Sequence, residues 1–196
     1  MTLATIELFF GILALVAFGA VAGINLLRGV GRVSSGAADA YASVARAIAP
    51  HAFAMAWFVA LLATAGSLYF SDVAGFEPCR LCWYQRIAMY PLVVLLAIAA
   101  ARRERTGALY AGGLAAMGAA IAAYHVALEW IPALDTGACD ASSPCTLIWF
   151  RVFGFISLPT LALAAFLLIL TVLSIRIPTH KAGPAQAQDQ DPRRIP

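Results

Sequence analysis

The chain has 196 residues, of which 62% are hydrophobic and only 12% are charged. Soluble globular domains are roughly half apolar and about a quarter charged, so the composition excludes an ordinary soluble domain and indicates an integral membrane protein. The formal net charge of +3 is small, and the sequence has no basic patch with interleaved aromatic residues. Nucleic acid is therefore excluded as the expected partner.

Five apolar runs are long enough to cross a hydrocarbon core, which requires about 20 residues in a helix. The first run lacks the basic segment that opens a signal peptide, so we expect it to be retained as a helix. The predicted fold class is an all-α integral membrane protein, with a four-helix transmembrane bundle plus one additional N-terminal transmembrane helix. The runs are Thr5–Leu27, Ala52–Phe70, Tyr84–Ala101, Ala108–Trp130 and Ile156–Ile175.

The remaining segments divide the chain into three parts. Between the first two runs, Tyr41, Val44, Ala45 and Ile48 recur at helical spacing, which predicts a short amphipathic helix lying on the inner membrane surface. From Pro178 onward the composition is typical of a disordered cytoplasmic tail. The predicted parts are 1–50 for the extra helix and amphipathic linker, 51–176 for the bundle, and 177–196 for the tail.

Glycines mark two of the runs. Gly19 and Gly23 lie four residues apart on the first, and Gly112, Gly113 and Gly118 lie on the fourth. Small residues let helices approach closely in a membrane. We therefore expect these faces to pack against neighbouring helices, or, for the first run, against a second protein.

The distribution of lysine and arginine predicts the orientation, because cytoplasmic loops carry an excess of both. If the turn after the third run is cytoplasmic, ten basic residues lie inside and three outside. The N-terminus is then outside and the C-terminus inside, and both cysteine pairs face the oxidising side, where disulfides persist. The inner ten are Arg28, Arg32, Arg46, Arg102, Arg103, Arg105, Arg176, Lys181, Arg193 and Arg194, and the outer three are Arg80, Arg86 and Arg151.

The first cysteine pair directly precedes the third run. Cys79 and Cys82 are close enough along the chain to form one short disulfide. With a helix starting near Cys82, unpaired backbone N–H groups would favour a thiolate there. Arg86 lies one turn further on the same face and can steady that anion. The alternative is that Arg86 only extends its charge to the membrane surface.

The residues Pro78-Cys79-Arg80-Leu81-Cys82-Trp83-Tyr84-Gln85-Arg86 opening a transmembrane helix resemble the disulfide bond formation protein B (DsbB) family, in its short-loop form. The segments Tyr90-Pro91 and Ser157-Leu158-Pro159 fit the same family. The resemblance covers about Ala52 to Ile175, so the first helix is an addition to the family pattern.

The resemblance implies a thiol:quinone oxidoreductase of the bacterial inner membrane. It would reoxidise a periplasmic thioredoxin-like (DsbA-type) dithiol oxidase and pass electrons to ubiquinone or menaquinone. Cys79 and Cys82 would be the pair next to the quinone, with Cys82 engaging the quinone ring and Arg86 stabilising that contact. Gln85 matches the motif without an assigned role.

The second pair, Cys139 and Cys145, lies in a loop rich in Gly, Ser and Pro. By order along the chain and the family resemblance, Cys139 would meet the partner enzyme and Cys145 would resolve toward the first pair. Only five residues separate the two cysteines, which favours a compact disulfide that exchanges directly over one that depends on a long rearrangement.

His125 and Glu129 lie four residues apart on the fourth run and share a face. His125 could bind near the quinone and deliver a proton to it; the alternative is a satisfied polar pair at the membrane surface. Arg151 is expected to anchor at lipid headgroups, and Trp83, Tyr84 and Trp149 to belong to the interfacial aromatic belt, although one of these aromatics could line the quinone site.

Four other interpretations of the cysteines remain open. A zinc site with four cysteine ligands would use the same residues, but the sequence offers no second shell for it, so no metal is expected. Static disulfides in a structural membrane protein are a further alternative. A vitamin K epoxide reductase-like enzyme would carry its Cys-x-x-Cys later in the bundle, and a transporter of reducing power would need cysteines on both sides.

Overall fold

A computed structural model of the chain describes residues 2–102, 106–135, 137, 139 and 143–175. In these residues the protein is all-α apart from an isolated bridge between Val152 and Ile156, which confirms the predicted fold class. The helices are α1 (Leu3–Val30), α2 (Ser35–Ile48), α3 (Ala52–Leu68), α4 (Arg80–Arg102), α5 (Thr106–Trp130) and α6 (Leu158–Ser174).

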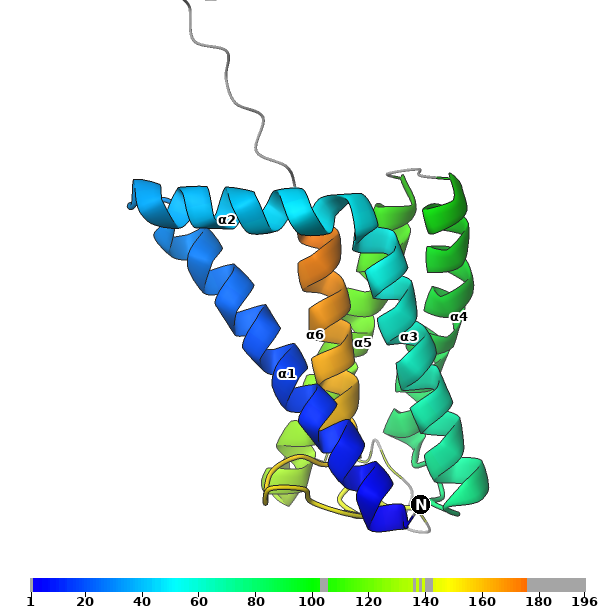
Figure 1. The fold of residues 1–196 in the computed structure, drawn as a ribbon. Helices are drawn as coiled ribbons and strands as arrows, with labels where there is room; N and C mark the ends of the chain where they lie inside the picture. The colour runs from blue at the N-terminus through cyan, green and yellow to red at the C-terminus, as the bar shows by residue number, and fades with distance from the viewer. Residues whose placement is uncertain (1, 103–105, 136, 138, 140–142, 176–196) are drawn as a thin grey trace, which may run out of the picture.

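Helices α3 to α6 form the bundle, and α6 is its central member (Figure 1). Helix α6 packs against α5, α3 and α1, while α4 packs between α3 and α5. Helix α1 runs obliquely along α6, and its Phe10 also contacts Gly66 of α3, so the N-terminal addition packs on the bundle mainly through α6.

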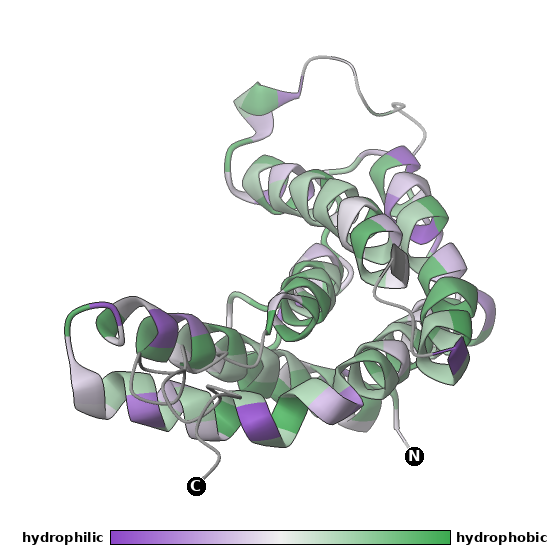
Figure 2. Cartoon of the chain, turned by 90° about the horizontal axis from the view of Figure 1, so that it is seen from above, coloured by the Kyte–Doolittle hydropathy of each residue, from purple (hydrophilic) through white to green (hydrophobic). Residues whose placement is uncertain are grey.

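Four helical segments are long and apolar enough to cross a membrane: Leu3–Val30, Ser35–Val73, Arg80–Arg102 and Gly107–Trp130. The fifth predicted run is the shorter helix Leu158–Ser174, which starts with Pro159 in its first turn. Figure 2 shows hydrophobic residues around the outside of the helices as well as between them. Large exposed side chains such as Val16, Phe58 and Val94 suit helices surrounded by lipid, and the protein is a multi-pass membrane protein.

The predicted amphipathic helix is α2, which lies across one end of the bundle, roughly at right angles to α3 to α6 (Figure 1). The N-terminus and the loops that carry the cysteines lie at the opposite end. The predicted tail from Pro178 onward lies outside the described residues, as do the basic residues Arg103, Arg105, Arg176, Lys181, Arg193 and Arg194.

Four of the predicted glycines make no close helix contact within the described residues, and for Gly19 and Gly23 a contact with a second protein stays a prediction. A Cβ added at Gly19 or Gly23 would meet nothing within 4 Å among the described residues, and the same holds for Gly112 and Gly113. Gly118 is different, because its missing side chain leaves room for the ring of Phe166 on α6. Helix α1 approaches the rest of the protein through another set of small residues on a different face: Gly11, Ala14 and Ala17.

Candidate thiol–disulfide site

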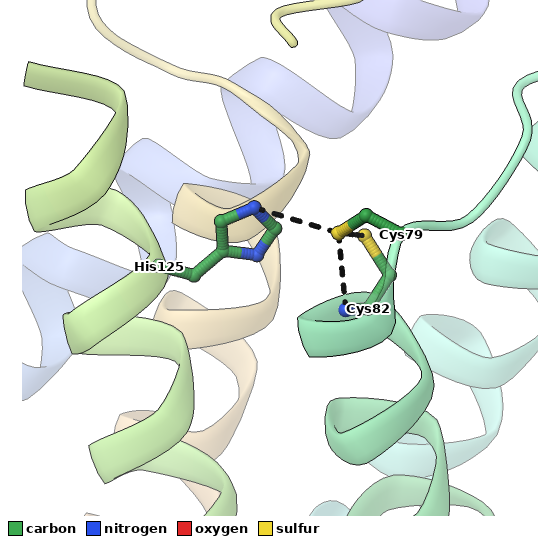
Figure 3. Close-up of side chains that lie close together, drawn as sticks. All are labelled: Cys79, Cys82 and His125. Carbon is green, nitrogen blue, oxygen red and sulfur yellow. Dashed lines mark hydrogen bonds between the residues drawn. The ribbon is translucent and has the colours of Figure 1, made fainter. Parts of the chain in front are cut away.

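Cys79 stands directly before the first residue of α4, at the N-cap position. Its sulfur accepts the backbone N–H of Cys82 at 3.4 Å, the bond that an N-cap side chain ordinarily makes to the third residue of a helix. The two sulfurs are 2.8 Å apart (Figure 3), so a disulfide needs only a small movement. The helix begins earlier than Tyr84, where the apolar run starts, because the polar residues before it form its first turn.

Hydrogen bonds from the Cys82 thiol and from His125 make Cys79 the preferred thiolate of this pair. The hydrogen bond from the Cys82 thiol lowers the pKa of Cys79 far below the ordinary value for a cysteine, and the hydrogen bond and charge interaction with His125 act in the same direction. Burial raises this pKa by more than either interaction with His125 lowers it, but the hydrogen bond from Cys82 has the largest effect. The sequence predicts the anion on Cys82, whereas the structure places the stronger stabilisation on Cys79.

His125 lies between the two cysteine pairs. Its Nε2 is 3.0 Å from the carbonyl oxygen of Cys145 and 3.8 Å from the sulfur of Cys79, and its Nδ1 is 3.0 Å from the amide nitrogen of Gln85. A carbonyl oxygen can only accept, so Nε2 carries the proton and Nδ1 accepts from Gln85. Figure 3 shows the ring directed at Cys79. Gln85, a motif residue without an assigned role, therefore orients this imidazole.

The second pair forms a disulfide between Cys139 and Cys145, with their Cα atoms 5.8 Å apart. Cys145 is fully buried, while Cys139 is only partly buried. Although the pairs are far apart in sequence, Cys79 and Cys145 belong to one buried cluster that also contains Leu81 and Leu128. The fold thus brings all four cysteines together at one end of the bundle.

A pocket of about 320 Å³ begins on the other side of the first pair. Cys82 lines it and Cys79 does not, so only Cys82 of the first pair is exposed to this pocket. Its walls come from α1, α3, α4 and α6 and are mostly apolar. The polar side chains that line it come from the end of α3, from the segment that follows it and from the first half of α4: Ser67, Ser71, Glu77, Gln85, Arg86 and Tyr90.

Arg86 is held at this pocket by α3. Its Nε donates to the hydroxyl of Ser67 at 3.1 Å, and one terminal nitrogen donates to the Ser67 carbonyl at the same distance. The Tyr90 hydroxyl also donates to the Ser67 hydroxyl, and the guanidinium lies over the ring of Trp83. Arg86 is therefore fixed beside Cys82 at the pocket and is not extended freely toward the membrane surface.

The residues that were predicted to bind quinone do not all line the larger pocket. His125 lies outside the larger pocket and lines a small cavity of about 20 Å³ with Cys79, Cys82 and Glu129. Glu129 is buried and accepts from the hydroxyl of Ser157, while Arg151 donates to the Glu129 carbonyl at 3.3 Å. His125 and Glu129 thus share a face but have separate hydrogen-bond partners.

Ser67 and Ser157 lie inside predicted apolar runs, and neither was predicted to act in the site, because a serine within an apolar run carries no signal of the residue that it will contact. The three aromatic residues predicted for the interfacial belt lie in two kinds of surroundings. Trp83 and Tyr84 are about half exposed, as expected of an interfacial belt, but Trp149 lines the pocket and stacks on Phe76 at 4.7 Å.

The ligand atoms of Cys79, Cys82 and His125 lie within 4.8 Å of one another, so this trio could hold a metal ion. A zinc site of four cysteines does not fit, because Cys139 and Cys145 are joined to each other and zinc binds thiolates. The remaining possibility for a metal ion is a site with three ligands, Cys79, Cys82 and His125.

Comparison with known proteins is consistent with this arrangement. The chain is 45% identical to the "Probable disulfide formation protein C" of Bacillus cereus over 120 residues, which are 61% of this chain and 86% of that protein. It is 42% identical to the "Disulfide bond formation protein C" of Bacillus subtilis over 120 residues, which are 61% of this chain and 87% of that protein. No solved structure matches the chain significantly. The family described as "Disulfide bond formation protein DsbB" matches residues 49–175, which include the four cysteines and helices α3 to α6, and the chain belongs to this family.

Proposed function

We propose that this protein is a thiol:quinone oxidoreductase that reoxidises a periplasmic DsbA-type dithiol oxidase and passes the electrons to ubiquinone or menaquinone. One observation carries the proposal. Cys79 lies against His125 and the buried cluster of Cys145, while its neighbour Cys82 lines an apolar pocket among the helices. The first pair thus lies between a second disulfide and a compartment suited to a lipid-soluble electron acceptor.

Electrons enter at the second pair. A thiolate of the partner attacks the more accessible Cys139, which releases Cys145 as a thiolate. The partner's other thiolate then attacks its own sulfur in the mixed disulfide. The products are an oxidised partner and two reduced cysteines, Cys139 and Cys145. The different burial of these two sulfurs supports this order of attack.

The second exchange passes two electrons to the first pair. The Cys145 thiolate attacks Cys79 in the Cys79–Cys82 disulfide and releases Cys82. Cys139 then attacks Cys145, re-forms the second disulfide and releases Cys79. The low pKa of Cys79 makes it a good leaving group for that last step, because thiols of lower pKa leave faster.

The larger pocket fits a quinone in size and chemistry. Its volume of about 320 Å³ is in the range of small-molecule sites, and it combines apolar walls with donors from Arg86. A bound quinone would accept two electrons and two protons as Cys79 and Cys82 return to the disulfide. Arg86 would hold the polar head beside Cys82, and His125 would keep its proton within reach of Cys79.

We further propose that residues 51–176 carry the redox function in the bacterial inner membrane, with the cysteines facing the periplasm. Residues 1–50 are an accessory part and 177–196 a cytoplasmic tail. The position of the Cys-x-x-Cys at the start of α4 argues against a vitamin K epoxide reductase-like enzyme, and four cysteines gathered at one end argue against a carrier of reducing power across the membrane.

The test uses purified protein, quinone and a reduced DsbA-type partner, with quinone reduction followed by absorbance. We expect the wild-type protein to reduce quinone as the partner becomes oxidised. Cys139→Ser and Cys145→Ser should each stop partner oxidation, and quinone should still oxidise the Cys79–Cys82 dithiol. Wild-type rates of partner oxidation in both variants would show that the second disulfide is only structural.

A further inference from the structure

Helix α1 lies outside the part of the chain that matches the DsbB family, yet it forms one wall of the pocket beside Cys82. Six of its residues line the pocket: Phe10, Leu13, Ala14, Val16, Ala17 and Ala20. They recur at helical spacing over about three turns. The pocket therefore extends well along α1, away from the cysteines.

Close contacts fasten α1 at the cysteine end. The ring of Phe10 lies against Gly66 of α3, where an added Cβ would be only 2.6 Å from the ring, and it contacts the ring of Phe70 with centroids 5.6 Å apart. On its other side, Gly11 lies against Val152, where an added Cβ would be 2.8 Å from the side chain. Because both contacts need a glycine, α1 has a defined position here.

Beyond this point α1 stays on α6. Ala14 and Ala17 pack with Ala164, and further along Asn25 donates to the hydroxyl of Thr171 at 3.3 Å. The pocket occupies the space between α1 and α3, and two of its lining residues, Val16 of α1 and Phe58 of α3, are 64% and 59% exposed. The pocket therefore opens to the surrounding lipid between these two helices.

The lining changes character along its length. Near the cysteines it has Ser67, Cys82 and Arg86, whereas along α1 it has small and apolar side chains such as Leu13, Ala17 and Ala20. A ligand that fills it needs a polar head at the redox pair and a long apolar tail. The small side chains of α1 leave room for that tail.

We infer that α1 is a specificity element of the electron acceptor site, forming with α3 and α6 a channel that holds the isoprenoid tail of the quinone. This inference rests on the proposed function, because it assumes that quinone binds beside Cys82. The helix that this chain adds to the family bundle then selects the acceptor by its tail and leaves the thiol chemistry unchanged.

The test places a larger side chain on α1 inside and outside the channel. Ala20→Phe fills part of the pocket, Ala20→Val fills less of it, and Ala22→Phe is the matched control, because Ala22 is exposed and does not line the pocket. The probes are a long-tailed ubiquinone and its tailless head-group analogue, each reduced by the full-length protein with a DsbA-type partner.

We expect Ala20→Phe to raise the KM for the long-tailed quinone about tenfold, with a smaller rise for Ala20→Val and no change in kcat. Both variants should match the wild-type protein with the tailless analogue, which also shows that they fold. Equal kinetics for Ala20→Phe, Ala22→Phe and wild type with both quinones would overturn the inference, as would an equal loss with both quinones in Ala20→Phe. A wild-type protein that reduces neither quinone would instead overturn the proposed function.

Discussion

His125 and the helix start make the two sulfurs of the first pair unequal. Cys79 accepts a backbone N–H at the N-terminus of α4 and lies 3.8 Å from Nε2 of His125. Both interactions favour an anion, since the helix N-terminus carries a partial positive charge. The side chain that faces the second disulfide is therefore the one best prepared to leave as a thiolate.

Replacing His125 should raise the pKa of Cys79. A hydrogen bond to a charged group contributes about 1.5–3 kcal/mol, so His125→Leu should raise this pKa by about one to two units. The measurement is the rate of Cys79 alkylation against pH in the reduced protein, read by mass spectrometry. His51→Leu, at the other end of the bundle, is the control.

The direction of the pH dependence follows from the pKa of the Cys79 thiol, which is lower in the folded protein than in the unfolded chain. The stabilisation of the reduced form is complete above the unfolded value and is lost as the pH falls through the folded one. As the pH is lowered, alkylation of Cys79 in the wild-type protein should thus stay fast well below pH 8. In His125→Leu the rate should begin to fall at a higher pH than in the wild-type protein. Identical pH profiles would assign His125 to packing.

Arg86 should act through its planar, multi-donor head. Arg86→Lys keeps the charge but cannot reproduce both bonds to Ser67, and Arg86→Met loses the charge as well. We expect quinone affinity to fall in the order wild type, Lys, Met. The affinity of Arg86→Met should be lower by about tenfold or more, which corresponds to a loss of about 1.4 kcal/mol or more in binding free energy.

Ser67→Ala probes the same contact from α3. It leaves the guanidinium in place without its side-chain acceptor, so its quinone affinity should lie between those of wild type and Arg86→Met. The measurement is quinone binding to membranes that contain equal amounts of each variant. Equal affinity in all the Arg86 variants would mean that the charge only reaches toward the membrane surface.

At the scale of the helices, packing depends on where small residues face. Gly118→Ala would push a methyl group into the ring of Phe166, whereas Gly113→Ala meets nothing within 4 Å among the described residues. Overpacking costs about 1–3 kcal/mol, so Gly118→Ala should lower the free energy of unfolding by that amount. Gly113→Ala should leave it unchanged or raise it slightly.

Unfolding of the purified variants by a denaturing detergent provides the measurement for this pair. Equal stability of the two variants would contradict the tight contact between α5 and α6. The same contrast explains why glycine spacing predicted helix contacts poorly on α1. Spacing shows that Gly19 and Gly23 share a face, but the direction of that face depends on how the whole helix lies on α6.

At the level of the molecule, the described basic residues that are predicted to be cytoplasmic lie at the end opposite the cysteines, while Arg80, Arg86 and Arg151 lie at the cysteine end. The described basic residues Arg28, Arg46 and Arg102 lie on or next to the end that α2 crosses, and the cysteine pairs lie at the other. Basic residues favour the cytoplasmic side. A membrane-impermeant thiol reagent should therefore label all four cysteines from outside after reduction, and labelling of either pair only from the cytoplasm would reverse the orientation.

The helices, the position of both cysteine pairs next to apolar runs and the family could be predicted from the sequence, because they depend on local hydrophobic runs and on residue spacing. It also identified Cys79, Cys82 and Arg86 as neighbours, since they lie within about two turns of one helix. The predicted start at Tyr84 lies after the observed start of α4 at Arg80, because hydrophobicity marks the apolar core of a span and not its polar first turn.

The contacts that these residues make with other helices could not be predicted from the sequence and follow from the three-dimensional fold. The contact between Cys79 and His125 joins residues 46 apart in the chain, and Arg86 meets Ser67 across two helices. Such contacts depend on the rotation and tilt of each helix, which hydrophobic spacing leaves open when a helix is apolar on all sides. For the same reason α1, which carries no redox residue, could be recognised as a wall of the pocket only once its face toward α3 and α6 was known.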